Sequence, residues 1–163
     1  MQMLRISLMF LCTGLIAVQA AESINQTIIG TNPLLSAGAN ALRIGDFEEG
    51  VSLTLDGLDA SMTPRQRAIA FSNVCAGYIG LRQFAKALET CDKALDLNDR
   101  NWRIYNNRAL ALLNAGRIVA AREDIKKGFA LNPGSSTLAK VANLIKARAR
   151  NRVVAKDRVI EVH

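Results

Sequence analysis

The sequence has few of the residue types from which catalytic and metal sites are built. Its only histidine is His163, no cysteines and histidines stand at metal-ligand spacing, and no glycine-rich phosphate loop follows a strand pattern. The acidic pairs Glu48-Glu49 and Glu123-Asp124 fall early in predicted helices, where carboxylates favour the positive end of the helix dipole. We therefore expect no enzyme activity, no metal and no cofactor.

Aromatic residues are also scarce. They make up 5% of the 163 residues, whereas half of the chain is apolar, enough for a sizeable core. A fold that packs helices through alanine and glycine needs few aromatic side chains. The composition is therefore compatible with close helix packing.

Long apolar runs are absent except at the start of the chain. Arg5 precedes an apolar run over 6–18, and small residues flank a cleavage signature at 18–20, so residues 1–20 are predicted to be a signal peptide. A membrane anchor is the alternative, but 13 residues are short of the roughly 20 that a span needs. Bulky Leu11 before Cys12 argues against a lipoprotein signal. We expect an exported protein, periplasmic or secreted and bacterial, with a short polar leader over 21–30.

A constant step of 34 residues relates two copies of one unit, predicted over 68–101 and 102–135. The matching pairs are Phe71 with Tyr105, Asn73 with Asn107, Ala87 with Ala121, Leu97 with Leu131, and Asn98 with Asn132. A fixed period of this size is typical of repeat proteins, in which each unit buries its apolar face by stacking on the next.

An earlier, degenerate copy is predicted over 31–67. It is related to the second copy by a step of 37, as from Gly45 to Arg82 and from Phe47 to Phe84, which places a three-residue insertion near Pro64. Pro33 suits the first turn of a helix, and Gly38 is a small residue where two helices can approach closely.

A further helix is predicted over 136–150, after Pro133 and a Gly-Ser-Ser turn. Its apolar residues fall on one face, as in the capping helix that covers the last apolar surface of a repeat array. They are Leu138, Val141, Ala142, Ile145 and Ala149. Residues 151–163 are predicted to be a loosely ordered basic tail.

These motifs resemble the tetratricopeptide repeat, a 34-residue helix–turn–helix unit with an early aromatic, small residues at the helix crossing and a terminal proline. The third copy carries the pattern in Tyr105, Ala109, Gly116, Ala121, Gly128 and Pro133, and the second in Phe71, Tyr78, Phe84, Ala87 and Ala94. The second copy departs from it at Asp99, in place of the proline, and at Arg82, in place of the glycine between the helices. The resemblance implies an all-α fold, a right-handed α-solenoid of three helix–turn–helix units plus a C-terminal capping helix.

The resemblance also implies a concave groove lined by the first helix of each unit. In that frame the partner-binding candidates are Asn73, Arg103, Asn106, Asn107 and Leu110. An asparagine amide both donates to and accepts from a peptide backbone, so it suits a bound segment or helix of another protein. The alternative for Asn106 and Asn107 is a role in capping or an exposed position without a ligand.

Some chaperone-binding members of this family hold a partner's C-terminal carboxylate with lysine, asparagine and arginine in the groove. Asn73 and Arg103 match two of these places. Leu35 and Ala39 stand where a lysine and an asparagine are expected, and Asn107 where an arginine is expected. The set is incomplete, so we do not transfer that function.

In the repeat frame Cys75 and Cys91 lie midway along two antiparallel helices and face each other. They are candidates for a disulfide in an oxidising compartment. The alternative is a pair of small buried thiols that fill the core.

Positive charge is concentrated at the C-terminal end. After Ser135, seven basic residues stand against two acidic ones, a net charge of +5. The basic-tail candidates are Lys146, Arg148, Arg150 and Arg152. They form either a solvated face or a docking site for an acidic partner or an anionic membrane surface. Nucleic acid is not expected, because the segment has no aromatic residues for base stacking.

The sequence thus predicts a non-catalytic adaptor that binds a partner peptide or helix in the groove. The alternative is a structural component that docks through its basic tail. The oligomeric state and the identity of the partner do not follow from the sequence.

Overall fold

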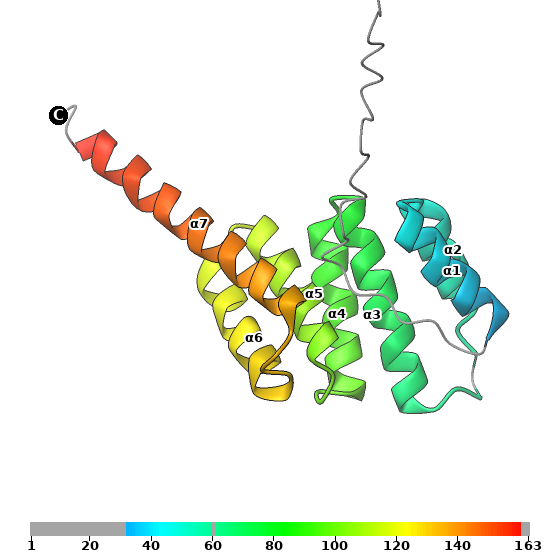
Figure 1. The fold of residues 1–163 in the computed structure, drawn as a ribbon. Helices are drawn as coiled ribbons and strands as arrows, with labels where there is room; N and C mark the ends of the chain where they lie inside the picture. Colours follow the sequence, from blue (N-terminus) through cyan, green and yellow to red (C-terminus); the bar gives the residue numbers. More distant parts are fainter. Residues whose placement is uncertain (1–31, 60, 161–163) are drawn as a thin grey trace, which may run out of the picture.

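The computed structural model describes residues 32–59 and 61–160, and this part of the chain contains seven helices and no strand (Figure 1). The helices are α1 (Pro33–Ile44), α2 (Phe47–Asp56), α3 (Pro64–Gly80), α4 (Phe84–Leu97), α5 (Trp102–Asn114), α6 (Ile118–Leu131) and α7 (Ser136–Ile160). They form three successive helix pairs, α1–α2, α3–α4 and α5–α6, followed by α7. The predicted all-α solenoid is confirmed. The predicted signal peptide (1–20) and leader (21–30) lie outside the described residues.

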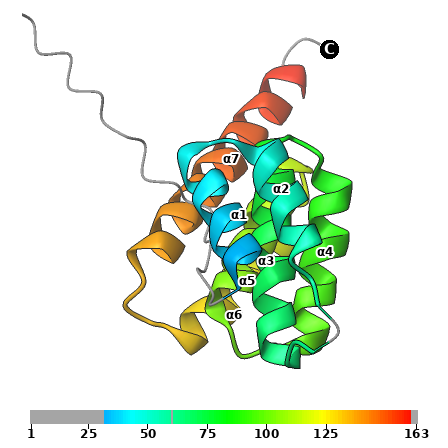
Figure 2. The ribbon, with the colours of Figure 1, turned by 90° about the vertical axis from the view of Figure 1, so that its right-hand side faces the viewer.

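The first helices of the pairs line the inner side of the solenoid. Among the described residues α1 contacts α3, α3 contacts α5, and α5 contacts α7, whereas α2, α4 and α6 do not contact one another. Helices that touch along one side and separate on the other curve the array toward the touching side. The helices α1, α3, α5 and α7 therefore form one inner face, and α2, α4 and α6 form the outer face (Figures 1 and 2).

The first helices of the pairs begin at side-chain caps. Asn32 Oδ1 accepts from the backbone N–H groups of residues 34 and 35, and Asn101 Oδ1 accepts from that of Arg103. Thr63 forms a capping box with Gln66. Pro33 and Pro64 occupy first-turn positions, where a missing N–H has no cost. These residues set where each repeat starts.

The turn within each helix pair uses one residue in the left-handed conformation. Gly45 has φ +91°, Gly116 has φ +76°, and Arg82 at the matching position of the second pair has φ +58°. Only glycine adopts this conformation without steric cost. The turn geometry is thus common to all three units. In the second pair it requires a positive φ angle at Arg82, which is sterically unfavourable for an arginine.

Small residues occupy the points where the paired helices cross. A methyl group at Gly38 would lie 3.0 Å from Gly50 O and from Thr54 N, so α1 and α2 meet nearly backbone to backbone. In the second pair, Cys75 and Cys91 lie at the corresponding positions, and a disulfide joins their sulfur atoms with the Cα atoms 5.4 Å apart. Both cysteines are fully buried, in a cluster that includes Ala87 and Ala94. The crossing points of the first and second pairs are therefore built from small side chains.

Helix α7 covers the end of the array. Leu138, Val141 and Ile145 are buried against the third helix pair, as expected for a capping helix. The helix does not end near Arg150 as predicted; it continues through residues 151–160 and projects beyond the solenoid (Figures 1 and 2). From Ser136 to Ile160 there is no glycine or proline to end it. The prediction of a loosely ordered tail from residue 151 was wrong for this stretch.

None of the helices in the described ranges has the length and apolar character that crossing a membrane requires.

Candidate functional site

Most of the predicted groove residues are buried along α3 and α5. Asn73, Asn106 and Asn107 are at most 1% exposed, Leu110 is also buried, and Arg103 is partly exposed. Their roles as partner contacts stay predictions. They lie on α3 and α5, the first helices of the second and third pairs, as the alignment of the repeats predicts.

Asn107 connects two neighbouring repeats. Its Nδ2 donates to the backbone carbonyl of Ser72 at 3.2 Å and lies 3.3 Å from Ser72 Oγ, which links α5 to α3. The Nδ2 of Asn106 lies 3.5 Å from Asn107 Oδ1. A buried amide that satisfies a backbone carbonyl stabilises the packing of the two helices. Replacing Asn107 would therefore disturb the stacking of the repeats, whatever else it contacts.

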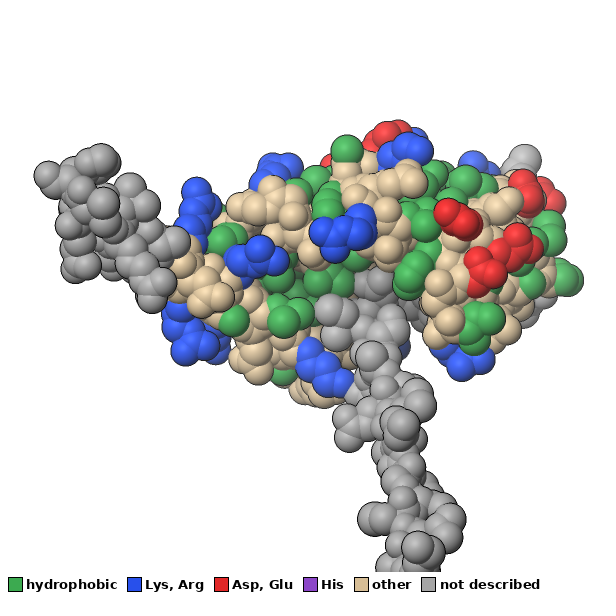
Figure 3. All heavy atoms as spheres, turned by 90° about the horizontal axis from the view of Figure 1, so that it is seen from above, with side chains coloured by type: hydrophobic (Ala, Val, Ile, Leu, Met, Phe, Trp, Pro, Cys, Tyr) green, Lys and Arg blue, Asp and Glu red, His purple; other side chains and the backbone are tan. Residues whose placement is uncertain are grey.

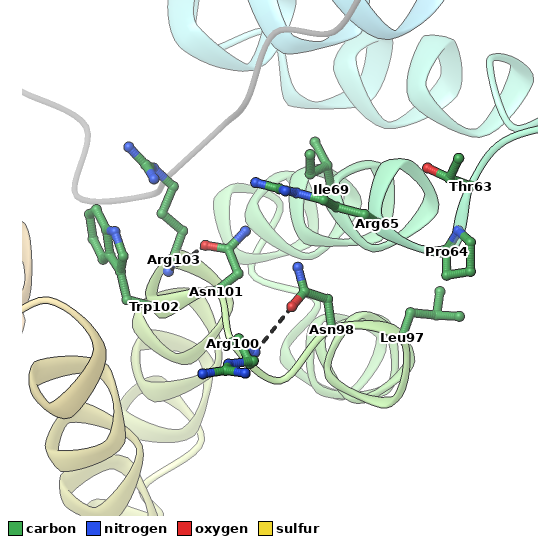
Figure 4. Close-up of a pocket in the computed structure, with 10 residues that line it drawn as sticks. All are labelled: Thr63, Pro64, Arg65, Ile69, Leu97, Asn98, Arg100, Asn101, Trp102 and Arg103. Carbon is green, nitrogen blue, oxygen red and sulfur yellow. Dashed lines mark hydrogen bonds between the residues drawn. The ribbon is translucent and has the colours of Figure 1, made fainter.

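A pocket of about 770 Å³ opens beside these residues, at the N-terminal ends of α3 and α5 (Figure 4). Arg65 and Ile69 come from α3, Leu97 ends α4, and Trp102 and Arg103 begin α5. The loop between α4 and α5 adds Asn98, Arg100 and Asn101, and Thr63 and Pro64 complete the lining. Ile69 and Arg103 are equivalent positions of successive repeats, 34 residues apart. The pocket thus lies between two repeats, at the edge of the inner face.

The polar groups that line this pocket are mainly donors. Arg65 extends from α3 toward α5, and Asn101 lies between its tip and Arg103 (Figure 4). Asn98 lies on the side of Leu97, Arg103 points away from Arg65 alongside Trp102, and Arg100 also points away. The Oδ1 atoms of Asn98 and Asn101 accept from the backbone N–H groups of Arg100 and Arg103, both at 3.1 Å. Their amide Nδ2 atoms have no acceptor in the part of the chain that the structure describes. No described lining residue is acidic, and none of the three guanidiniums is ion-paired with a described residue.

Trp102 gives the pocket an apolar wall next to these charges. The guanidinium of Arg103 lies over its indole ring, 4.5 Å from the ring centroid. Such a cation–π contact holds the guanidinium in place without neutralising its charge. Ile69 and Leu97 are the other apolar lining residues. The pocket therefore combines positive charge with apolar surface.

Another arginine, Arg108, is paired with acidic residues of two neighbouring helices. Arg108 of α5 forms a bidentate pair with Asp124 of α6, at 2.7 and 2.8 Å, and contacts Asp92 of α4 at 2.6 Å. The hydrogen bond to Asp124 raises the pKa of the Arg108 guanidinium above its ordinary value, so it remains protonated. Burial likewise raises the pKa of Tyr105 on the same helix. Arg108 thus ties three helices together and has no free charge for a ligand.

The basic-tail candidates lie along α7. Lys146, Arg148, Arg150 and Arg152 are all exposed. Seen along the top of the molecule, acidic side chains gather over one end of the visible face and basic ones lie over the rest (Figure 3). Within the described residues no cluster of histidine, cysteine and acidic side chains could hold a metal.

The sequence missed most of the pocket residues. Arg103 was a candidate, but Arg65, Asn98, Arg100 and Asn101 were not. Arg65 stands 38 positions before Arg103, and only the stacking of α3 on α5 brings their side chains to one pocket. A scan of the loops between repeats for donor side chains would have found Asn98, Arg100 and Asn101.

Comparison with known proteins agrees with this architecture. A sequence model described as a tetratricopeptide repeat matches residues 90–123. Sperm-associated antigen 1 of Mus musculus is 29% identical over 114 residues, which are 70% of this chain and 12% of that protein. The rat protein is 28% identical over 120 residues, 74% of this chain and 13% of its own length. The chain thus matches only a small part of these relatives.

Solved structures share the fold. The first tetratricopeptide-repeat domain of Spaghetti (RPAP3), bound to the HSP90 peptide SRMEEVD, superposes with a TM-score of 0.63 and 22% identity, covering 74% of this chain and 93% of that domain. The Sgt2 tetratricopeptide-repeat domain of Aspergillus fumigatus has a TM-score of 0.64 and 21% identity, covering 76% of this chain and 80% of its own. With the helix pairs described above, these matches show that the described residues form an α-solenoid with the fold of tetratricopeptide-repeat domains, and the matched sequence model covers one such repeat at residues 90–123.

Proposed function

We propose that this protein is a non-catalytic adaptor that binds a segment of another protein on the inner face of its solenoid. The observation that carries the proposal is the pocket between α3 and α5, which opens on the edge of that face and presents donors without paired acceptors. Stacked helices offer an extended surface rather than an enclosed reaction site. Binding a polypeptide segment is the task that suits this shape.

Structural neighbours support protein binding in general terms. The Spaghetti domain was solved with an HSP90 peptide, and the second RPAP3 domain, with a TM-score of 0.61, with an HSP70 peptide. The fold alone does not transfer those partners. Leu35 and Ala39 are buried apolar residues where the carboxylate-holding set would need polar ones, so the proposal does not include those chaperones.

We also propose that the protein acts in an exported compartment, periplasmic or secreted, as the signal sequence predicts. The disulfide between Cys75 and Cys91 supports this, because such bonds persist in oxidising compartments and are rare in the cytosol. Labelling of free thiols in a freshly prepared extract tests it, with the protein unfolded in denaturant because both cysteines are fully buried in the folded state. Resistance of both cysteines to alkylation before reduction is expected, and full alkylation would overturn the exported assignment.

A second candidate function is docking through the basic face of α7. The observation that favours it is the exposure of four cations along α7, namely Lys146, Arg148, Arg150 and Arg152. A partner of this kind would be an acidic protein or an anionic membrane surface. Its binding should weaken steeply with salt, since exposed charges are screened within about 10 Å at 0.1 M ionic strength.

Site-specific photo-crosslinking distinguishes the two functions. A photoreactive residue is placed at Ile69 on the inner face, at Lys146 on α7, and at Val119, which is 74% exposed on α6, as a control for the outer face. The adaptor proposal expects one defined protein to crosslink from Ile69 and not from Val119. Crosslinks from Lys146 alone would assign binding to α7, and the absence of crosslinks from both positions would remove both proposals.

A further inference from the structure

We propose that copies of this chain associate head to tail, with α7 of one copy packed on the exposed end of the first helix pair of the next copy. This association uses the two ends of the solenoid and leaves the inner face free, so it goes beyond the adaptor function. For α7 it rests on the second candidate function above, and it makes the acidic partner of that helix a second copy of this chain.

The first helix pair has a packing face that no preceding pair covers. In α3 the equivalent face lies against the first pair, since a methyl group at Gly77 would collide with Val51 of α2. Val74, one turn earlier on the same face of α3, is fully buried. The step of 37 residues places Ala37 and Asn40 of α1 at these two positions, and both are exposed. A surface that packs on a neighbour in the second repeat is therefore open in the first.

The open face continues along α1 and onto α2. Ile44 lies one turn beyond Asn40 on the same side of α1 and is 67% exposed. On α2, Phe47 faces α3, because a methyl group at Gly80 would collide with its ring. Glu49 and Asp56 lie about half a turn around the helix from Phe47, on the side away from α3, and both are exposed. The end of the first pair thus combines helix-packing positions with exposed carboxylates.

The two ends of the solenoid carry opposite charge. Residues 33–56 contain one basic and four acidic side chains, a net charge of 1 − 4 = −3, whereas residues 136–152 of α7 contain five basic and no acidic side chains, a net charge of +5. The four acidic residues are all exposed; they are Asp46, Glu48, Glu49 and Asp56. Acidic side chains gather at the end of the visible face where the first pair lies, away from the basic side chains of α7 (Figure 3). Such complementarity favours contact between unlike ends and opposes contact between like ends.

The basic end has a cleft that lacks an acidic partner. Arg122 of α6 and Lys146 and Arg150 of α7 line a cleft of about 510 Å³, together with Asn143 and Ala149. No described residue that lines it is acidic, and the ion pairs between described residues involve none of these cations. Carboxylates from the first pair of a second copy would supply the acceptors, as charge-assisted hydrogen bonds to guanidinium and ammonium groups require.

Head-to-tail contact leaves one end of each copy free. Because the two contacting surfaces differ, the interface is heterologous, and further copies add until a ring closes or the supply of protein ends. Growth of the mass with concentration is therefore expected to continue beyond the dimer. Sedimentation velocity of the full chain over a range of concentrations measures it. The association should be present at low ionic strength and lost near 1 M salt, where exposed charges are screened within about 3 Å.

Reversal of charge at either end should weaken the association at least about tenfold, since like charges then face each other. The two variants are Glu49→Lys/Asp56→Lys and Lys146→Glu/Arg150→Glu. A chain that carries all four changes has the net charge of the wild type and again has opposite charges at its two ends. It should regain most of the lost association, which a general loss of folding would not allow.

The control variant is Asp96→Lys/Asp99→Lys. It changes the net charge as Glu49→Lys/Asp56→Lys does, at exposed positions of the second pair and the loop after it, and it should associate as the wild type does. Circular dichroism checks that every variant keeps its helices. A photoreactive residue at Ile44 identifies the occupant of the end face, and the expected crosslink joins it to residues 136–152 of a second copy.

Several results would overturn the inference. They are sedimentation as a monomer at every concentration, unchanged association in both end variants, and no recovery in the helical chain with all four changes. A crosslink from Ile44 to residues 21–31 of its own chain would also overturn it, because the leader would then cover the face. If Lys146 crosslinks only to another protein or to lipid, docking through α7 stands and the self-association fails. Crosslinks from Ile69 test the adaptor function separately.

Discussion

The three helix pairs share one geometry but fill their crossing point with different residues. The same position in the repeat holds Gly38 and Thr54 in the first pair, Cys75 and Cys91 in the second, and Ala109 and Ile125 in the third. All six are buried. The architecture therefore accepts buried residues from glycine to isoleucine at this point, and it does not require a particular chemistry.

The first and second pairs show the two extremes of this choice. At Gly38 the helices approach so closely that a methyl group would meet backbone atoms of α2 at 3.0 Å, and Thr54 Oγ1 donates to Gly50 O at 2.6 Å. At Cys75 the helices are joined by a covalent bond across 5.4 Å between Cα atoms. One pair is held by close backbone contact and the other by a crosslink, which predicts different sensitivities to mutation.

Removing the crosslink should have the largest effect. The double variant Cys75→Ala/Cys91→Ala should lose about 3 kcal/mol of unfolding free energy, because a bridge between residues 16 apart restricts the unfolded chain by about that amount. Chemical denaturation measures it. Reducing agent should destabilise the wild type similarly and leave the variant unchanged. An equal effect of reducing agent on both proteins would contradict the role given to the bridge.

Adding one methyl group to the first pair should have the next largest effect. Gly38→Ala should cost about 1 to 2 kcal/mol, because overpacking against the α2 backbone exceeds the gain in helix propensity. The control is Gly134→Ala, where nothing lies within 4 Å of the added methyl group. Thermal unfolding of both variants measures the difference. A Gly38 variant as stable as the control would show that the first pair has room for a larger residue.

The turn of the second pair offers the smallest change, and it should be a gain. Arg82→Gly should stabilise the protein by about 0.5 to 1 kcal/mol, because glycine adopts φ +58° without steric cost and the Arg82–Phe84 ring contact at 5.7 Å contributes little at the surface. The matched control is Gly116→Ala at φ +76°, with no atom within 4 Å of the new methyl group. It should destabilise by about 1 kcal/mol, and denaturation midpoints measure both. Loss of stability in the Arg82 variant would mean that its side-chain contacts outweigh the backbone cost.

The helix pairs were predictable because their signals are local. A step of 34 residues and small residues at fixed places indicated the second and third pairs, and a step of 37 together with Pro33 at a first-turn position indicated the first, before any packing was known. The end of α7 was not predictable in this way. A charged stretch without glycine or proline has no stop signal, and the tail interpretation treated its charge as a sign of disorder.

The candidate site was predictable only in part. Arg103 was found from its place on a first helix, but Arg65, Asn98 and Asn101 were not. The amide of Asn107 was expected to face a partner or solvent, or to cap, and the structure shows it bonded to Ser72 of the preceding repeat. Whether a polar side chain bonds to the neighbouring repeat or stays accessible to a ligand depends on how one repeat packs on the next.

The sequence by itself determined that this chain is a stack of helix pairs and which two cysteines can meet, because these follow from periodicity and short-range chemistry along one chain. The tertiary structure alone decided that Arg108 is bound between Asp92 and Asp124 while Arg65 and Arg103 share an open pocket. The physical reason is that the charge of an arginine is determined by its residue type, but its availability depends on which carboxylates the packing of other helices brings within reach.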